Sequence, residues 1–136
     1  MTTLYPFKEI LICGKDYSEI AQKRQSLHDL LNIPFISLTD GTATRDSHHQ
    51  YFFDNHLKFA PDIEAATTDQ IIPMVIHNLG IGFCPEKLAK PFIESGDILQ
   101  IPLIESELER EICLIQDISR GTSIAVSKLI NMLIED

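Results

Sequence analysis

With 136 residues, of which 44% are hydrophobic, the chain is long enough to bury a core of its own, which excludes an intrinsically disordered protein. Its 20 acidic residues outnumber 11 basic ones and give a formal charge of -9, so we expect no direct contact with nucleic acid. No apolar run approaches the roughly 18 residues that cross a bilayer, and residues 1–8 lack the apolar core of a signal peptide; we expect a cytoplasmic protein with no membrane contact.

Segments rich in β-favouring residues alternate with segments of helical spacing. The first part of the chain is predicted to contain a strand at 7–13, a loop with room for one helical turn at 17–25, a helix at 26–31 capped by Ser26, a strand at 35–38, a turn at 39–44 and a helix at 43–57. The middle part is predicted to contain a strand at 61–66, a helix with apolar positions from 71 to 79, a strand at 80–84 and a helix at 86–93 broken by Pro91. The last part is predicted to contain a strand at 98–102, an acidic connector at 105–111, a strand at 112–116 and a helix at 123–134. Six strands alternating with helices through short loops predict an α/β fold, a three-layer αβα sandwich with a mixed, mostly parallel sheet.

Residues 67–86 determine how the other elements can pack. The helical positions of this stretch are Ile71, Ile72, Val75, Ile76 and Leu79. Thr68 or Asp69 is placed to cap the helix, Pro73 is expected to kink it, and Asn78 tolerates the left-handed conformation of a helix end. The strand at 80–84 is apolar on both faces, as a central strand buried between helices requires.

The helix at 43–57 is predicted to be amphipathic. Its expected inward stripe consists of His49, Phe52, Phe53, His56 and Leu57. His49 and His56 lie two turns apart, roughly 10 Å along the axis, which is too far to share one metal ion without a third ligand. We therefore expect no metal site here.

The turn at 40–44 is the candidate small-molecule site, because it follows a strand and opens a helix. Free N–H groups and the positive end of the helix dipole favour an anion at such a position. Thr42 and Thr44 add hydroxyl groups, and Arg45 could pair with a carboxylate. Alternatively, Thr42 or Thr44 only caps the helix and Arg45 is a solvated surface residue. A second helix start contains Thr68, for which capping alone is also a sufficient explanation.

An enzyme is the alternative that the sequence leaves open. Cys13, Cys84 and Cys113 form no close pair and all lie in predicted strands, which indicates buried small hydrophobic residues. A small cytosolic α/β enzyme would have to use Cys84 or the region of His48 and His49, yet a buried strand raises the pKa of a thiol. No Gly-rich phosphate loop, GxSxG or HExxH motif is present, and we expect neither activity nor cofactor.

Residues 71–103, IIPMVIHNLGIGFCPEKLAKPFIESGDILQIPL, resemble the second subdomain of the effector-binding domain of LysR-type transcriptional regulators. That family has an apolar helix, a G-x-G strand, Pro-Glu, a short helix and a closing strand in this order. Residues 26–36 are similar to its Leu-x-x-Leu-x-x-x-Pro-Phe-Ile stretch, and residues 41–45 resemble its effector-contacting turn. The resemblance implies a periplasmic-binding-protein-like fragment spanning 1–136, with crossover strands at 7–13 and 110–117 and a C-terminal helix at 121–136.

Membership would imply a sensor of a small, often anionic effector that Thr42, Ala43 and Thr44 contact, with Arg45 and Thr68 as further candidates. It would also imply a homodimer. The family's N-terminal helix-turn-helix has no room before Phe7, so we expect the C-terminal portion of a regulator whose absent part binds DNA. A pure oligomerisation module remains a further alternative.

Overall fold

The computed structural model describes the backbone of residues 2–114 and the side chains of residues 6–110. The expected helix at 121–136 and the end of the expected strand at 110–117 lie outside the described residues. Spatial proximity divides the chain into two units, one of residues 8–108 and one that holds the described residues 2–7 and 109–114. All candidate site residues belong to the unit of residues 8–108.

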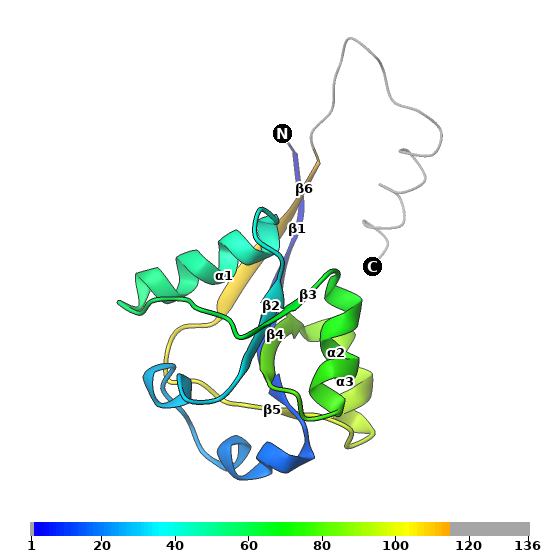
Figure 1. Cartoon of the computed structure of the whole chain (residues 1–136). Helices are drawn as coiled ribbons and strands as arrows, with labels where there is room; N and C mark the ends of the chain where they lie inside the picture. Colours follow the sequence, from blue (N-terminus) through cyan, green and yellow to red (C-terminus); the bar gives the residue numbers. More distant parts are fainter. Residues whose placement is uncertain (1, 115–136) are drawn as a thin grey trace. The chain divides into compact units, whose positions relative to one another are not determined.

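Strands and helices alternate largely as the sequence predicts. In chain order the elements are β1 (Thr2–Cys13), the 3-10 helices η1 (Lys15–Gln22) and η2 (His28–Leu30), β2 (Phe35–Leu38), α1 (Ala43–Asp54), β3 (Ile63–Ala65), α2 (Thr68–Ile76), β4 (Ile81–Pro85), α3 (Glu86–Glu94), β5 (Leu99–Gln100) and β6 (Leu108–Leu114) (Figure 1). None of the helices within residues 2–114 combines the length and the apolar composition needed to cross a membrane.

The strands form one mixed sheet with the order β3-β2-β4-β1-β5, and β6 also pairs with β1. β2 runs parallel to β3 and to β4, whereas β1 runs antiparallel to β4 and to β5. A mixed sheet with helices confirms the predicted α/β class. The expected parallel majority is wrong for these four pairs, because β1 lies between β4 and β5 and opposes both.

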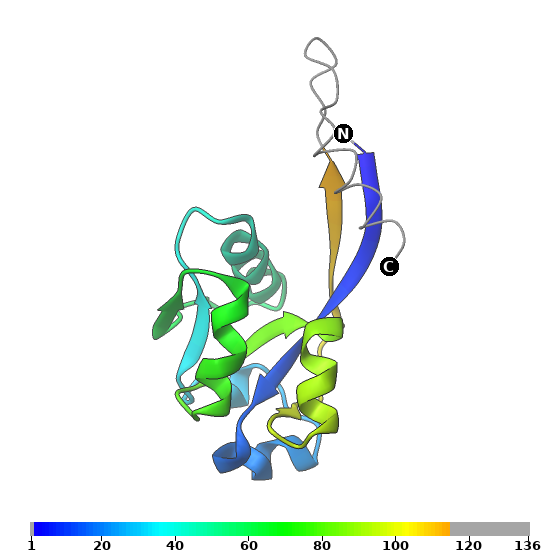
Figure 2. The same ribbon diagram turned by 90° about the vertical axis from the view of Figure 1, so that its right-hand side faces the viewer.

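Helices cover both faces of the sheet, as a three-layer αβα sandwich requires. α2 and α3 lie together on one face and α1 lies on the other (Figures 1 and 2). Since side chains alternate along a strand, β1 sends Ile10 and Ile12 to the α2 face and Leu11 and Cys13 to the α1 face. The sheet therefore separates two hydrophobic cores.

The buried residues of each core come from several elements. The core under α2 and α3 contains Ile10, Ile12, Ile36, Leu38, Ala65, Ile71, Ile72, Val75, Cys84, Ala89 and Ile98. The core under α1 contains Leu11, Cys13, Leu27, Leu30, Phe35, Tyr51, Phe52, Ile81, Phe83, Ile101 and Leu108. β2 is buried along its whole length and contributes to both cores.

The predicted inward stripe of α1 is wrong by about one residue. The helix buries His48, Tyr51 and Phe52, whereas His49 is exposed and Phe53 is 67% exposed. The helix also ends at Asp54, before the last two residues of the expected stripe. His48 can occupy an inward position because its ring nitrogens have hydrogen-bond partners inside the core. The spacing of apolar residues in the sequence cannot indicate such a bond.

Several helix boundaries also differ from the prediction. The N-cap residue of α2 is Thr67, rather than Thr68 or Asp69. The side chain of Thr67 makes no capping bond. α3 continues through Pro91 and is not broken there. Pro91 has no N–H group to donate, but its carbonyl still accepts a bond of 3.1 Å from Ser95 N. Asn78 adopts the predicted left-handed conformation, with φ of 61°.

The segment between β1 and β2 is more regular than expected. η1 is eight residues long, where the sequence predicted a loop with a single turn. η2 is shorter than the predicted helix at 26–31, although Ser26 Oγ does accept a bond of 3.2 Å from Asp29 N, as its capping role requires. Apolar residues of both segments pack into the core under α1.

Replacing Gly80 by Ala is expected to lower the free energy of unfolding by about 1–3 kcal/mol, as overpacking of a tight site does. A Cβ atom at Gly80 would lie 2.5 Å from the carbonyl oxygen of Pro34, which accepts the bond from Ile81 N at the start of the β2–β4 pairing. Urea denaturation measures the change.

Gly82→Ala is the matched control, because its Cβ atom would lie 3.0 Å from the nearest atom, the carbonyl oxygen of Ile36. We expect a smaller loss than for Gly80→Ala. An equal or greater loss for Gly82→Ala would contradict the assignment of the close contact to Gly80.

Candidate functional site

The candidate turn lies at the carboxyl end of β2, where α1 begins. Gly41 has φ of 91°, a conformation that glycine adopts without steric cost. Thr42 is the N-cap of α1: its Oγ1 accepts a bond of 3.1 Å from Arg45 N and donates one of 2.9 Å to Thr39 O. The predicted alternative that Thr42 caps the helix is therefore confirmed, and its hydroxyl already has two partners.

Arg45 connects the start of α1 to the two neighbouring strands. Its guanidinium donates a bond of 3.0 Å to Leu38 O at the end of β2 and lies 3.4 Å from Glu64 Oε1 in β3. The same group stacks 5.5 Å from the centre of the Phe59 ring. The side chain is 18% exposed, so the alternative of a solvated surface arginine is wrong.

The start of α2 lies at the same edge of the sheet as the start of α1. β2 and β3 are parallel, with Leu38 paired to Ala65, and each strand is followed by its helix within a few residues. Thr68 is the first residue of α2 and is half-buried. Parallel strands thus bring Thr68 and the turn of Thr42 to one edge, although the two lie far apart in the sequence.

The same edge receives the start of a third helix. β4 is also parallel to β2, and α3 follows it directly at Glu86. Three helix N-termini therefore point their positive dipole ends toward one side of the sheet. Acidic residues stand in all three first turns, namely Asp46, Asp69 and Glu86, and partly offset that positive potential.

This edge can hold an anion by hydrogen bonding but has no described group for covalent chemistry. Helix geometry leaves the N–H group of Ala43, the first residue of α1, without an acceptor in the helix itself. Ala43 is exposed and Thr44 is half-buried, so a ligand can reach both. The turn is not covered by other segments of the described chain.

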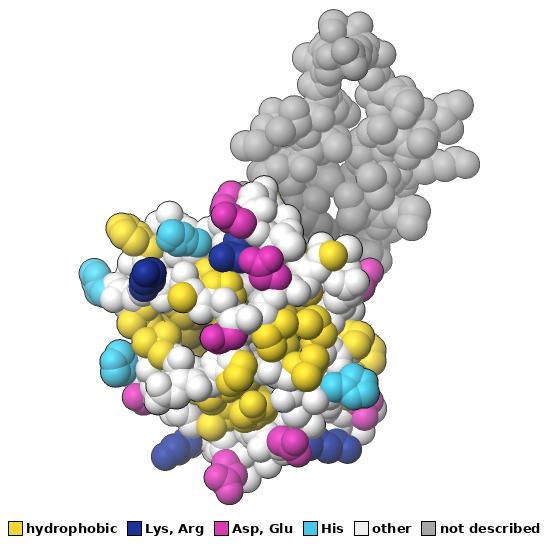
Figure 3. Space-filling view, in the orientation of Figure 1, with side chains coloured by type: hydrophobic (Ala, Val, Ile, Leu, Met, Phe, Trp, Pro, Cys, Tyr) yellow, Lys and Arg dark blue, Asp and Glu magenta, His cyan; other side chains and the backbone are white. Residues whose placement is uncertain are grey.

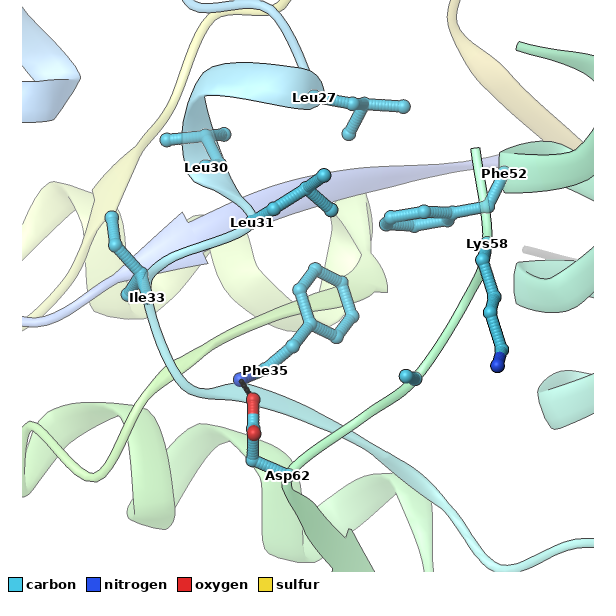
Figure 4. Close-up of a pocket in the computed structure, with 9 residues that line it drawn as sticks. Leu27, Leu30, Leu31, Ile33, Phe35, Phe52, Lys58 and Asp62 are labelled. Atoms are coloured by element: carbon cyan, nitrogen blue, oxygen red, sulfur yellow. Dashed lines mark hydrogen bonds between the residues drawn. The ribbon is translucent and has the colours of Figure 1, made fainter. Parts of the chain in front are cut away.

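A separate cavity of about 200 Å³ lies near the opposite edge, where β2 begins (Figure 4). Its lining consists of Leu27, Leu30, Leu31, Ile33, Phe35, Phe52, Lys58, Ala60 and Asp62. Asp62 Oδ2 accepts a bond of 3.0 Å from Phe35 N, so this carboxylate already holds the backbone. Sequence analysis missed the cavity because its walls come from four separate segments.

Three polar side chains are buried between α1 and the sheet. His48 Nδ1 lies 2.9 Å from Ser37 Oγ, and His48 Nε2 lies 3.3 Å from Glu9 Oε1. This order of serine, histidine and carboxylate resembles a hydrolase triad, but Ser37, which would be the nucleophile, is fully buried, and so is the ring of His48. His48 therefore does not support the enzyme alternative, and the neighbouring His49 points outward into solvent.

The described cysteines are poor nucleophiles. Burial raises the pKa of Cys84 to about 12, with smaller contributions from the carboxylates of Glu9 and Asp69, and burial alone raises the pKa of Cys13 to about 11. Both thiols are thus neutral at physiological pH. Their prediction as buried hydrophobic residues is confirmed, and the side chain of Cys113 lies outside the described residues.

Tyr51 fixes the other end of the buried face of α1. Burial, together with the carboxylate of Glu105, raises the pKa of Tyr51 to about 12, so the phenol keeps its proton. It donates a bond of 2.6 Å to Ser106 O. Glu105 itself accepts bonds of 3.1 and 3.2 Å from Leu27 N, so its charge holds the backbone before η2.

The visible surface offers no strongly basic area. On the face of Figure 3, lysine and arginine side chains are scattered singly, and acidic side chains and histidines stand around a hydrophobic centre. Within residues 2–114, no three His, Cys, Asp or Glu side chains stand close enough to hold a metal ion.

The sequence model of the LysR substrate binding domain matches residues 1–136. The HTH-type transcriptional activator CmpR of Synechocystis sp. (strain ATCC 27184 / PCC 6803 / Kazusa) is 29% identical over 72 residues, which are 53% of this chain and 24% of CmpR. This chain therefore aligns with about a quarter of that relative's length.

Solved structures of regulatory domains have the same fold. The regulatory domain of CcmR from Synechocystis PCC6803, in complex with 2-PG, has a TM-score of 0.74 at 13% identity and matches 98% of this chain and 64% of its own. The effector binding domain of QuiR, in complex with shikimate, scores 0.75 at 14% identity, with 98% and 62% covered. MetR, a LysR family regulator from N. meningitidis, scores 0.69 at 17% identity, with 98% and 61% covered.

Iodoacetamide at pH 8 is expected to label Cys13 and Cys84 at least about a hundredfold more slowly in the folded protein than in urea. Burial raises the pKa of the folded thiols from the ordinary value of 9.0 to about 11 for Cys13 and about 12 for Cys84. The reactive thiolate is correspondingly rarer, and both side chains are buried. A Cys113→Ser background restricts the label to these two residues, and mass spectrometry counts it. Rapid native labelling of Cys84 would revive the enzyme alternative.

Proposed function

The chain belongs to the LysR substrate-binding domain family, and from this premise we propose that it is the ligand-sensing part of a LysR-type transcription regulator. In this proposal it binds a small anionic effector at the carboxyl edge of β2 and β3 and takes part in homodimer formation. The observation that carries the proposal is the convergence of the α1 and α2 N-termini at that edge. Such convergence concentrates N–H donors and positive dipole ends.

Different roles are proposed for the candidate residues. The N–H group of Ala43 would donate to the anion, and the hydroxyl of Thr44 would be a further contact. Thr42 would shape the turn, since its hydroxyl already bonds Arg45 N and Thr39 O. Arg45 would act mainly by holding the start of α1 to β2 and β3. Thr68 would contribute from the start of α2.

Two related structures support a small-molecule ligand in general terms. CcmR was solved with 2-PG and the QuiR domain with shikimate, and both share the fold of this chain. Shikimate carries a carboxylate, which is the kind of group that a helix N-terminus accommodates. The identity of the ligand for this chain does not follow from either neighbour, because sequence identity to both is low.

The wider setting is part of the same proposal. The formal charge of -9 supports a chain that leaves DNA contact to another part of the regulator, and a cytoplasmic location agrees with that role. An enzyme finds less support, since the thiols of Cys13 and Cys84 are neutral and His48 is buried. A pure oligomerisation module would leave the turn with the exposed residues Gly41 and Ala43 without a role.

Thr44→Val is expected to weaken effector binding about tenfold to a hundredfold. The substitution keeps the shape of the side chain but removes a hydroxyl, and one hydrogen bond to a charged group contributes about 1.5–3 kcal/mol. Isothermal titration of the chain and of the full-length regulator, with a panel that contains inorganic phosphate, shikimate and short carboxylates, supplies the dissociation constants.

Ser18→Ala in η1 is the control, because it removes a hydroxyl from a segment that precedes β2 and lies outside the candidate turn. Its dissociation constants should equal those of the parent. Equal affinities for Thr44→Val and the parent would move the site away from this turn. If no compound binds the full-length regulator, the effector proposal itself is contradicted.

A further inference from the structure

The network of Glu9, Ser37 and His48 joins α1 to two strands. Its members are 3%, 0% and 0% exposed, respectively, and belong to β1, β2 and α1. His48 Nδ1 lies 2.9 Å from Ser37 Oγ, and Nε2 lies 3.3 Å from Glu9 Oε1. Each ring nitrogen therefore contacts a different strand, and the imidazole bridges the helix and the sheet.

The bridge exists in either protonation state of His48. A neutral ring accepts from the Ser37 hydroxyl and donates from Nε2 to Glu9, and a charged ring donates to both oxygens. The orientation of α1 about its own axis is fixed in both cases, because hydrogen bonds depend on direction. Phe52 and the other apolar residues of the helix make contacts that tolerate small sliding movements.

Burying this network is costly, and packing alone does not require it. Apolar side chains of similar volume can replace a buried charged pair without loss of stability, and often with a gain. Every buried side-chain nitrogen and oxygen in the described part of the chain has a partner, so the cost is offset here by complete bonding. A complete polar network in an apolar core instead specifies one relative position of its parts.

The network connects the helix that carries the candidate effector turn to β1. His48 follows Thr44 by four residues and therefore stands one turn further along the same face of α1. Glu9 forms the first registered pair of β1 with β4, opposite Pro85. The N-terminal part of β1, residues 2–7, belongs to the second unit.

We propose that Ser37, His48 and Glu9 form a coupling element that transmits a displacement of the first turn of α1 to β1. When α1 moves, His48 changes its position against Glu9, and the backbone of β1 responds. The regulatory meaning of this coupling rests on the proposed function, since an effector at Thr42 to Thr44 would be the natural cause of the displacement. The coupling itself requires no ligand.

A ligand-free mutant cycle followed by NMR tests the coupling. Thr42→Ala removes the N-cap hydroxyl and disturbs the first turn of α1. In the parent chain we expect this substitution to shift the amide signals of Ile10 and Leu11. In a Glu9→Leu/His48→Leu background, which replaces the polar pair by apolar side chains, the same substitution should leave both signals unmoved.

Tyr51→Phe is the matched control background. It removes a different side-chain bond of α1, the one to Ser106 O, and leaves the network in place, so the shifts at Ile10 and Leu11 should persist. A dispersed NMR spectrum shows that each variant is folded. If the Glu9→Leu/His48→Leu variant does not fold, a Ser37→Ala/His48→Leu variant takes its place.

Shifts that persist without the network, or that never reach β1 in the parent chain, would overturn the proposal. Because the cycle uses no ligand, its failure leaves effector binding untouched. Conversely, a failed ligand titration leaves the result of the cycle standing.

Discussion

The parallel pairing of β2 with both β3 and β4 is the constraint on which the candidate site depends. Parallel strands end at the same edge of a sheet, so the helices that follow them begin at the same edge. β2 can occupy this position because all four of its side chains are buried. A site made from several helix starts thus follows from the arrangement of three short strands.

The antiparallel position of β1 has a different consequence. Its side chains alternate between two cores, and the alternation that places Leu11 and Cys13 under α1 also points Glu9 to that face. A carboxylate in such a place needs a hydrogen-bonding partner, which His48 supplies from the helix. The register of α1 follows from this, since the helix must turn His48, rather than His49, toward the sheet.

Local patterns predicted the elements whose signals are local, and they failed where a partner elsewhere in the chain decides. Phe35 to Leu38 is continuously apolar, and Thr42 stands before a helix, so a strand and a cap were both predictable. The inward position of His48 was not predictable, because it depends on Glu9, 39 residues away in the sequence. Likewise, no pattern indicates that Arg45 is held by Leu38 O and Glu64 rather than by solvent. The antiparallel placement of β1 was missed for the same reason.

The proposed anion site lies on a chain of net charge -9, which raises an electrostatic question. At physiological salt, exposed charges more than about 8 Å from a ligand are largely screened. The total charge therefore matters less than the groups that directly surround the ligand. At the turn of Thr42 those groups are N–H donors at a helix start, while the nearby carboxylate of Glu64 is already paired with Arg45. In the proposed site, Arg45 would assist an anion without touching it, because it neutralises the carboxylate that would otherwise repel the ligand. A negative net charge of the chain is therefore compatible with the proposed local recognition of a small anion.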